Sequence, residues 1–359
     1  NNVDVIICDH HLPAGEAVPA HATAVLCPPQ AGCEYPNKAL AACGVSLKLA
    51  QALLEDHPKC GPVIRSMLKV AAIGTVADVV DLSTPENRAI VAYGLKGLQA
   101  GVHAPGLRAL LDVAGLHGEI SSEDLGFKIG PRINAAGRLA KATTVIELFD
   151  ERDPARARAQ AQTLDELNQK RRTIQAELVD ICLASLPDPA PHFVTLWGAE
   201  KDGWHRGIVG IAAAKIRDAV HRPVAIIATS GTEARGSIRS IPGHHAVKAL
   251  DSVSDLLLGY GGHPAAAGFS VQTDNLEALQ KRLNIWAETQ TENTESAPNI
   301  DVDAICYAPD LRHPDIDILA QGLSDLGPHG KGNPAPVLQL ENIHVTHARP
   351  MGDKHLRLQ

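Results

Sequence analysis

The sequence predicts an α/β protein of several domains: a parallel-sheet domain first, then a long connecting helix, a second α/β domain and a final β-rich segment. Three observations lead to this prediction. Apolar, β-branched runs such as 3–7 and 223–228 have the composition of buried strands, and helical patterns separate them. The stretch 151–187 is amphipathic over many turns and ends in closely spaced prolines. The 359 residues, 45% of them hydrophobic, are enough for two or three cores.

Composition limits the classes of protein that need to be considered. The net charge of −8 argues against a protein that coats nucleic acid by bulk positive charge, so any such contact must come from local Arg and Lys clusters. The seven cysteines contain no Cys-x-x-Cys pair, which fits free thiols in a reducing compartment. No run of about 18 apolar residues appears. We therefore expect a cytoplasmic monomer with no membrane contact.

The first candidate site directly follows the first strand. Val3, Val5, Ile6 and Ile7 predict a buried parallel strand, and Asp9, His10 and His11 come at its end. Strand ends are where open α/β sheets place their chemistry. Neighbouring side chains on an extended chain point to opposite sides, so one histidine would bind a metal and the other would face substrate or solvent. A polar turn after a core strand would also explain these residues.

A second run, from 70 to 82, favours a metal site over a polar turn at Asp9–His11. Its small and β-branched residues predict another buried strand, which carries Asp78. A buried carboxylate costs several kcal/mol unless a cation or hydrogen bonds compensate for its lost hydration. A metal ion shared by His10 and Asp78 would supply that compensation.

These residues carry a family resemblance. Asp9-His10-His11 after an apolar strand, and Gly-Thr-Val-Ala-Asp-Val-Val from 74 to 80, resemble two signature motifs of the DHH phosphoesterase superfamily. The resemblance implies a two-metal site, with Mn²⁺ or Mg²⁺, that hydrolyses phosphodiesters. It implies that His10 and Asp78 bind metal, that Asp9 orients a ligand, and that His11 faces the scissile phosphate.

The same resemblance implies that something precedes the chain. The superfamily carries further carboxylate motifs on strands ahead of Asp-His-His, whereas this sequence begins eight residues before that motif. We therefore expect an N-terminally truncated fragment, which would bind metal weakly and cleave poorly or not at all.

A third candidate segment runs from 126 to 139. It contains three glycines and two arginines, Arg132 and Arg138, with Asn134 between the arginines. Acidic residues are almost absent from it. Glycine lets a backbone approach an anion, and arginine offers paired donors to phosphate oxygens. A glycine-rich turn with surface arginines is the alternative. The residue order resembles the single-strand exonucleases of the superfamily, which favours substrate contact by Asn134 and Arg138.

The second α/β domain supplies the remaining candidates. Ser237 and Arg239 would lie on one side of a strand, and Gly261-Gly262 would carry His263 on a backbone open to close approach. Alone, each could be an exposed strand or a tight turn. Together they resemble the DHHA1 domain, which implies that Ser237 and Arg239 hold a terminal phosphate. By the same resemblance His263 and the two glycines line the scissile site, and His205 and Arg206 face that cleft.

The last segment resembles an OB-fold that binds single strands. Its marker is the loop Gly-Pro-His-Gly-Lys-Gly-Asn-Pro-Ala-Pro at 327–336, and a polar linker is expected from about 288 to 298. Strand patterns are predicted at 300–305, 337–340, 343–346 and 355–358. The barrel is expected to be incomplete. Because only 3% of residues are aromatic, backbone contacts should outweigh base stacking.

The predicted domains are 1–150 (DHH, lacking its N-terminal motifs), 151–187 (the helix), 188–290 (DHHA1) and 298–359 (OB-fold). The predicted function is metal-dependent 5′-to-3′ hydrolysis of single-stranded DNA in repair and recombination, with a helicase and a single-strand-binding protein as partners implied by the resemblance. Two alternatives remain open. One is a phosphodiesterase of the same superfamily for short oligonucleotides or phosphoadenosine phosphate. The other is a catalytically silent replication scaffold.

Overall fold

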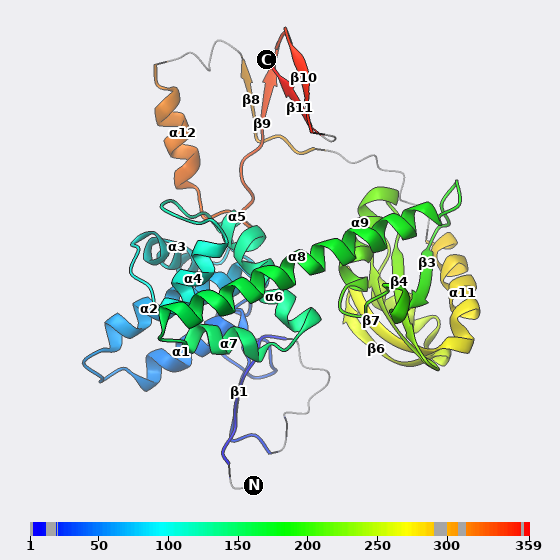
Figure 1. Cartoon of the computed structure of the whole chain (residues 1–359), viewed down its shortest axis with the longest axis horizontal. Helices are drawn as coiled ribbons and strands as arrows, with labels where there is room; N and C mark the ends of the chain where they lie inside the picture. The colour runs from blue at the N-terminus through cyan, green and yellow to red at the C-terminus, as the bar shows by residue number, and fades with distance from the viewer. Residues whose placement is uncertain (1–2, 12–18, 20, 291–299, 308–313, 353–354) are drawn as a thin grey trace. The chain divides into compact units, whose positions relative to one another are not determined.

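The computed structural model describes all residues except 1–2, 12–18, 20, 291–299, 308–313 and 353–354 (Figure 1). The chain divides into two compact units. The first unit comprises Asn1–Pro131 and Pro298–Gln359, and the second comprises Arg132–Ala297. The predicted α/β fold class is confirmed. Most of the linker predicted at 288–298 lies outside the described residues.

The first unit opens with two short strands and continues as a helical body. Its elements are β1 (Ile6–Cys8), β2 (Ala24–Leu26), α1 (Ala42–Leu53), α2 (Cys60–Ala77), α3 (Pro85–Gln99), α4 (Pro105–Val113), α5 (Ser122–Asp124) and the π-helix η1 (Leu125–Ile129). β1 and β2 pair in parallel, as predicted. The prediction that the first strand is buried is wrong, because Ile6 in β1 and Val5 just before it are about half exposed.

The prediction of a strand at 70–82 is also wrong, because residues 70–77 form the C-terminal part of the helix α2 and Asp78 is its C-cap. Ala71, Ala72 and Thr75 are buried where α2 packs between α1 and α3. The small side chains that suggested a strand allow this close helix packing instead, and periodicity cannot separate the two for a short apolar run. α2 is the one described helix long and apolar enough to cross a membrane by length and composition, and it packs against α1 and α3.

The glycines at 126–139 also serve helix packing. The segment forms η1 followed by α6 (Gly130–Leu139), which the boundary between the two units crosses. A Cβ at Gly126 would lie 3.5 Å from Val76, and one at Gly130 would lie 3.1 Å from Ala77. These two glycines therefore let the segment pack closely against the last turn of α2.

The C-terminal part of the first unit contains β8 (Ala304–Tyr307), α12 (Ile316–Asp325), β9 (Leu338–Glu341), β10 (Ala348–Met351) and β11 (His355–Leu358). β8 pairs with β9 in parallel, and β10 pairs with β11 antiparallel, so the described strands form two separate pairs. Residues 343–346, predicted as a strand, form none.

The second unit contains α6 from Arg132 on, α7 (Thr143–Asp150) and the long helix α8 (Pro154–Ala184), whose bounds match the prediction closely. Asp153 caps α8, because its carboxylate accepts a 2.8 Å hydrogen bond from the Arg156 backbone N–H. The remaining elements are β3 (Val194–Ala199), α9 (Val209–Val220), β4 (Val224–Ser230), β5 (Glu233–Arg239), α10 (Ala246–Asp251), β6 (Leu257–His263), β7 (Ala266–Gln272) and α11 (Leu276–Glu288).

These strands form one mixed sheet in the order β3-β4-β5-β7-β6, in which only β3 and β4 are parallel. Figure 1 shows α9 and α11 on opposite sides of the sheet. Side chains of β4 alternate between the two cores: Val224 and Ile226 pack with α8 and α9, whereas Ala225 and Ile227 pack with α10 and α11. A strand covered on both faces is apolar throughout, which is the pattern that predicted it.

Candidate functional site

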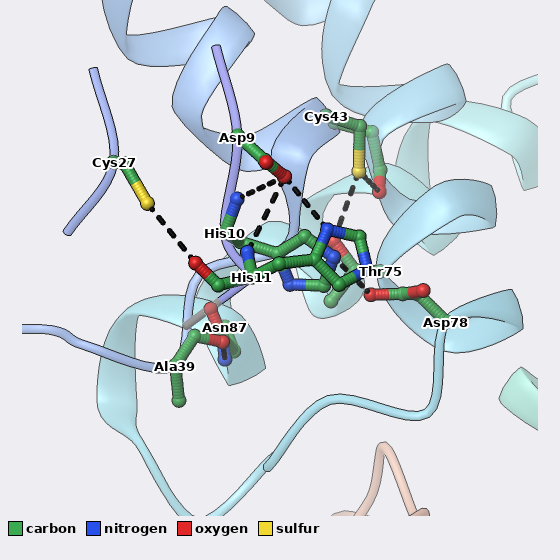
Figure 2. Close-up of polar contacts among 10 residues, drawn as sticks. Asp9, His10, His11, Cys27, Ala39, Cys43, Thr75, Asp78 and Asn87 are labelled. Carbon is green, nitrogen blue, oxygen red and sulfur yellow. Dashed lines mark hydrogen bonds and ion pairs between the residues drawn. The ribbon is translucent and has the colours of Figure 1, made fainter. Parts of the chain in front are cut away.

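One cluster of acids and histidines lies in the first unit, and we call it the acid–histidine cluster: Asp9, His10, His11 and Asp78. His10 follows the end of β1, and Asp78 caps the C-terminus of α2. His10 Nε2 lies 3.2 Å from Asp78 Oδ2 (Figure 2). The structure thus brings together the two predicted metal ligands, although one comes from a helix end where a strand end was predicted.

Asp9 organises the histidine side of the cluster. Its Oδ1 accepts hydrogen bonds from the backbone N–H groups of His10, at 2.7 Å, and of His11, at 3.3 Å. The same oxygen lies 2.8 Å from His11 Nδ1. The hydrogen bond to His11 is the largest cause of a lowered pKa of Asp9. This carboxylate therefore stays ionised at a lower pH than an ordinary aspartate does. Asp9 therefore holds the His11 ring and backbone in place.

The cluster has donors that suit a hard divalent cation. One donor atom each from Asp9, His10 and His11 lie within 4.8 Å of one another. Carboxylate oxygen suits both Mn²⁺ and Mg²⁺, and imidazole nitrogen is a common ligand of transition-metal ions. Two adjacent donors at about 2.1 Å from an octahedral ion lie roughly 3 Å apart, close to the 3.2 Å between His10 Nε2 and Asp78 Oδ2. The residues present fit a metal ion.

The second unit contains a basic pocket of about 600 Å³, which we call the arginine pocket. Its lining combines arginines from α6, the loop before α9 and β5 with glycines that leave the backbone open. The described lining residues are Gly137, Arg138, Arg206, Gly207, Val209, Gly210, Arg235, Gly236, Ser237, Arg239, Gly259, Gly268, Phe269 and Ser270, and none of these is acidic.

Alternation along β5 places the polar side chains in this pocket. Ala234 and Ile238 point into the core with α10 and α11, so Arg235, Ser237 and Arg239 point the other way. There they meet the first turn of α9, because a Cβ on Gly210 would lie 3.0 Å from both the Ser237 hydroxyl and an Arg239 nitrogen. A helix N-terminus favours an anion through its unpaired N–H groups and its dipole.

Two of the arginines are held in place by the protein itself. Arg239 Nη1 donates to the Ser237 hydroxyl and to the Ile238 carbonyl, each at 2.8 Å. Arg138 Nη1 donates to the Gly207 carbonyl at 3.0 Å. Burial, and then repulsion from Arg138 and Arg217, lowers the pKa of Arg239 from its usual value. Like charges held this close leave the pocket with a strong preference for an anion.

Sequence reasoning named four of these lining residues, namely Arg138, Arg206, Ser237 and Arg239. It missed Arg235, which the two-residue spacing from Ser237 could have revealed. Five other candidates do not line the pocket: Asn134, His205, Gly261, Gly262 and His263. The last three lie in β6, the edge strand, and are exposed. His205 instead accepts a 3.0 Å hydrogen bond from the Gly207 backbone N–H through its Nδ1.

Comparison with known families agrees with the domain resemblances. Residues 191–289 match the model of the DHHA1 domain, and residues 310–359 match that of the RecJ OB domain.

Several individual relatives carry the same name. The chain is 35% identical over 379 residues to the single-stranded-DNA-specific exonuclease RecJ of Dickeya dadantii, covering 99% of this chain and 64% of the relative. The Bacillus subtilis protein of that name is 34% identical over 353 residues, which span 98% of this chain and 43% of the relative. The chain therefore spans about half to two thirds of the length of these curated relatives.

Solved structures agree. Thermus thermophilus RecJ in complex with Mn²⁺ superposes over the whole of this chain and 51% of its own, with a TM-score of 0.83 and 32% identity. A structure of exonuclease RecJ bound to manganese matches 80% of this chain and 70% of its own, with a TM-score of 0.64 and 33% identity.

Proposed function

Because this chain belongs to the RecJ family, we propose that the complete protein containing it removes nucleotides from the 5′ end of single-stranded DNA by metal-dependent hydrolysis. The observation that carries the proposal is the 3.2 Å approach of His10 Nε2 to Asp78 Oδ2. These residues are 68 positions apart in the sequence, and their contact lies beside Asp9 and His11, so four potential metal ligands gather in one place.

In this proposal, His10 and Asp78 hold Mn²⁺ or Mg²⁺, in a site that takes two ions in the complete protein. When bound, such a metal acidifies a water molecule and stabilises the negative charge that develops on phosphate oxygens. Asp9 contributes without binding the substrate, because its hydrogen bonds fix the backbone and ring of His11.

His11 is the residue proposed to face the scissile phosphate. Its side chain is 70% exposed. With Nδ1 donating its hydrogen to Asp9, Nε2 keeps a lone pair that accepts a hydrogen bond from a water molecule. Protonated at Nε2, the same ring donates to a phosphate oxygen.

The arginine pocket is proposed to bind a phosphate group of the strand. Arg239 and Arg138 offer charged donors already held in place, and Ser237 adds a hydroxyl. A preorganised site loses little side-chain entropy when the phosphate enters. Asn134, His205, Gly261, Gly262 and His263 remain proposed substrate contacts by resemblance alone, since they do not line this pocket.

The natural substrate and partners follow from the same proposal. An enzyme of this specificity needs a strand with a free 5′ end, which a helicase would expose and a single-strand-binding protein would cover. We propose that the protein works on such strands in DNA repair and recombination, in the cytoplasm and as a monomer.

The proposal is tested with the complete protein, Mn²⁺ and three DNA substrates. These are a 5′-phosphorylated single strand labelled at its 3′ end, the same strand in a blunt duplex, and a dinucleotide. We expect the labelled single strand to shorten stepwise from its 5′ end, with much slower loss of the duplex. Faster cleavage of the dinucleotide would favour the short-oligonucleotide alternative, and no cleavage of any substrate would favour a silent scaffold.

A further inference from the structure

We call residues 326–333 of the first unit, which precede β9, the C-terminal loop. It packs on the helical body of the same unit. The Lys331 carbonyl accepts a 2.7 Å hydrogen bond from the Leu82 backbone N–H. The His329 carbonyl accepts one of 2.7 Å from the Ser122 hydroxyl, and the Leu326 carbonyl accepts one from the Arg88 guanidinium.

The C-terminal loop is cross-linked by its own hydrogen bonds. The Asn333 side-chain amide donates to two carbonyls of the loop, those of Leu326 at 3.0 Å and Pro328 at 2.9 Å. Gly330 and Asn333 also exchange two backbone hydrogen bonds. The carbonyls of this preformed loop thus accept hydrogen bonds from three separate parts of the helical body, which docks the loop on that body.

The contact surface lies directly beside the acid–histidine cluster in the chain. Asp78 is followed by Val79, whose backbone is left-handed with φ of 57°, and the segment 81–83 is then held on two sides. On one side the buried side chain of Asn87 donates to the Asp81 carbonyl at 2.9 Å. On the other side Lys331 accepts from Leu82, and Gly332 lies so close that a Cβ there would be 1.9 Å from Asp81 Oδ1.

We propose that the C-terminal loop is a positioning element for the metal site: by clamping segment 81–83, it fixes where α2 ends and so holds the Asp78 carboxylate at His10. A left-handed, β-branched residue such as Val79 is strained and persists only where its surroundings over-determine the backbone. The clamp supplies that constraint. This inference rests on the proposed function, because it presupposes that His10 and Asp78 bind a metal ion.

The test compares two glycine-to-alanine variants. In one the new Cβ collides with a neighbouring side chain, and in the other the new Cβ has open space. Gly332 has φ of 76° and Gly118 has φ of 85°, so alanine strains both backbones alike, but a Cβ at Gly118 meets nothing within 4 Å. Mn²⁺ alone is titrated calorimetrically into the complete protein carrying Gly332→Ala or Gly118→Ala. Substituting a residue that supports a metal ligand typically weakens metal affinity by about 10- to 100-fold. We expect the Mn²⁺ Kd of G332A to rise about tenfold above that of G118A.

A double variant separates clamping from general damage. In Asp81→Ala/Gly332→Ala the colliding carboxylate is gone, so its Mn²⁺ Kd should return to that of Asp81→Ala. If G332A does not fold, Ser122→Ala decides, because it deletes the hydroxyl that binds His329 and should also weaken Mn²⁺ binding. Two results overturn the clamp and leave the proposed function standing. One is a folded G332A that binds Mn²⁺ as tightly as G118A does, and the other is an S122A whose Mn²⁺ affinity is unchanged. Failure of the unaltered protein to bind Mn²⁺ would overturn the metal site itself, and the clamp with it.

Discussion

Asp78→Ala or His10→Ala in the complete protein is expected to lower the rate of Mn²⁺-dependent cleavage of single-stranded DNA by at least about 10³-fold. Each change deletes one of two donors that lie 3.2 Å apart. A metal ion supplies several kcal/mol of stabilisation to the developing charge, and about 4 kcal/mol corresponds to a factor of about 10³ in rate. The initial rate of nucleotide release under saturating strand measures this effect directly.

The matched control for these variants is His117→Ala. His117 is an exposed histidine of the same unit that lies 3.7 Å from a carboxylate oxygen of Asp112, so it repeats the His–Asp pairing away from the acid–histidine cluster. We expect wild-type cleavage from H117A. If H10A and D78A retained the rate of H117A, their assignment as metal ligands would be wrong.

Arg239→Gln is expected to raise the KM for a 5′-phosphorylated strand by about 10- to 100-fold while leaving kcat within a few-fold. The change shortens the side chain and removes its charge at a position where Ser237 and Ile238 hold the guanidinium. A hydrogen bond to a charged group is worth about 1.5–3 kcal/mol, which gives the range. Effects confined to KM would indicate lost binding that is equal in the ground and transition states.

Two further observations separate a phosphate contact from a structural role. The control is Arg282→Gln, which removes an exposed arginine of the same unit that is paired with Asp255 at 2.7 Å, and its KM should be unchanged. Strands with a 5′-hydroxyl should show a smaller difference between R239Q and wild type if the pocket binds the terminal phosphate. An equal KM increase for both strand types would contradict that assignment.

The acid–histidine cluster shows how far sequence reasoning could go. Asp9, His10 and His11 were expected at the end of a strand, and they do follow β1. The approach of Asp78 to His10 was inferred from the cost of an unpaired buried acid on a strand. That premise was wrong, because α2 is a helix and Asp78, at its C-cap, is partly exposed. Sequence similarity therefore brought the residue into view, and the physical argument for it failed at the level of secondary structure.

Other features depend on contacts that no local pattern contains. The alternation Arg235-x-Ser237-x-Arg239 was readable from strand geometry, but the glycine at 210 that admits these side chains to the first turn of α9 was not. Gly261 and Gly262 were expected on a backbone open to close approach, with a tight turn or an exposed strand as the alternatives, and they lie in the exposed edge strand β6. The docking of residues 326–333 on the helical body joins positions more than 200 apart and could not be predicted from either segment alone.

The central claim is that His10 and Asp78 hold one divalent cation together. Crystals of the complete protein grown with Mn²⁺, measured at wavelengths above and below the manganese absorption edge, locate that ion by its anomalous scattering. The account predicts a manganese peak at coordinating distance, about 2.2 Å, from both His10 Nε2 and an Asp78 carboxylate oxygen. A fully occupied manganese peak that contacts neither side chain would contradict it.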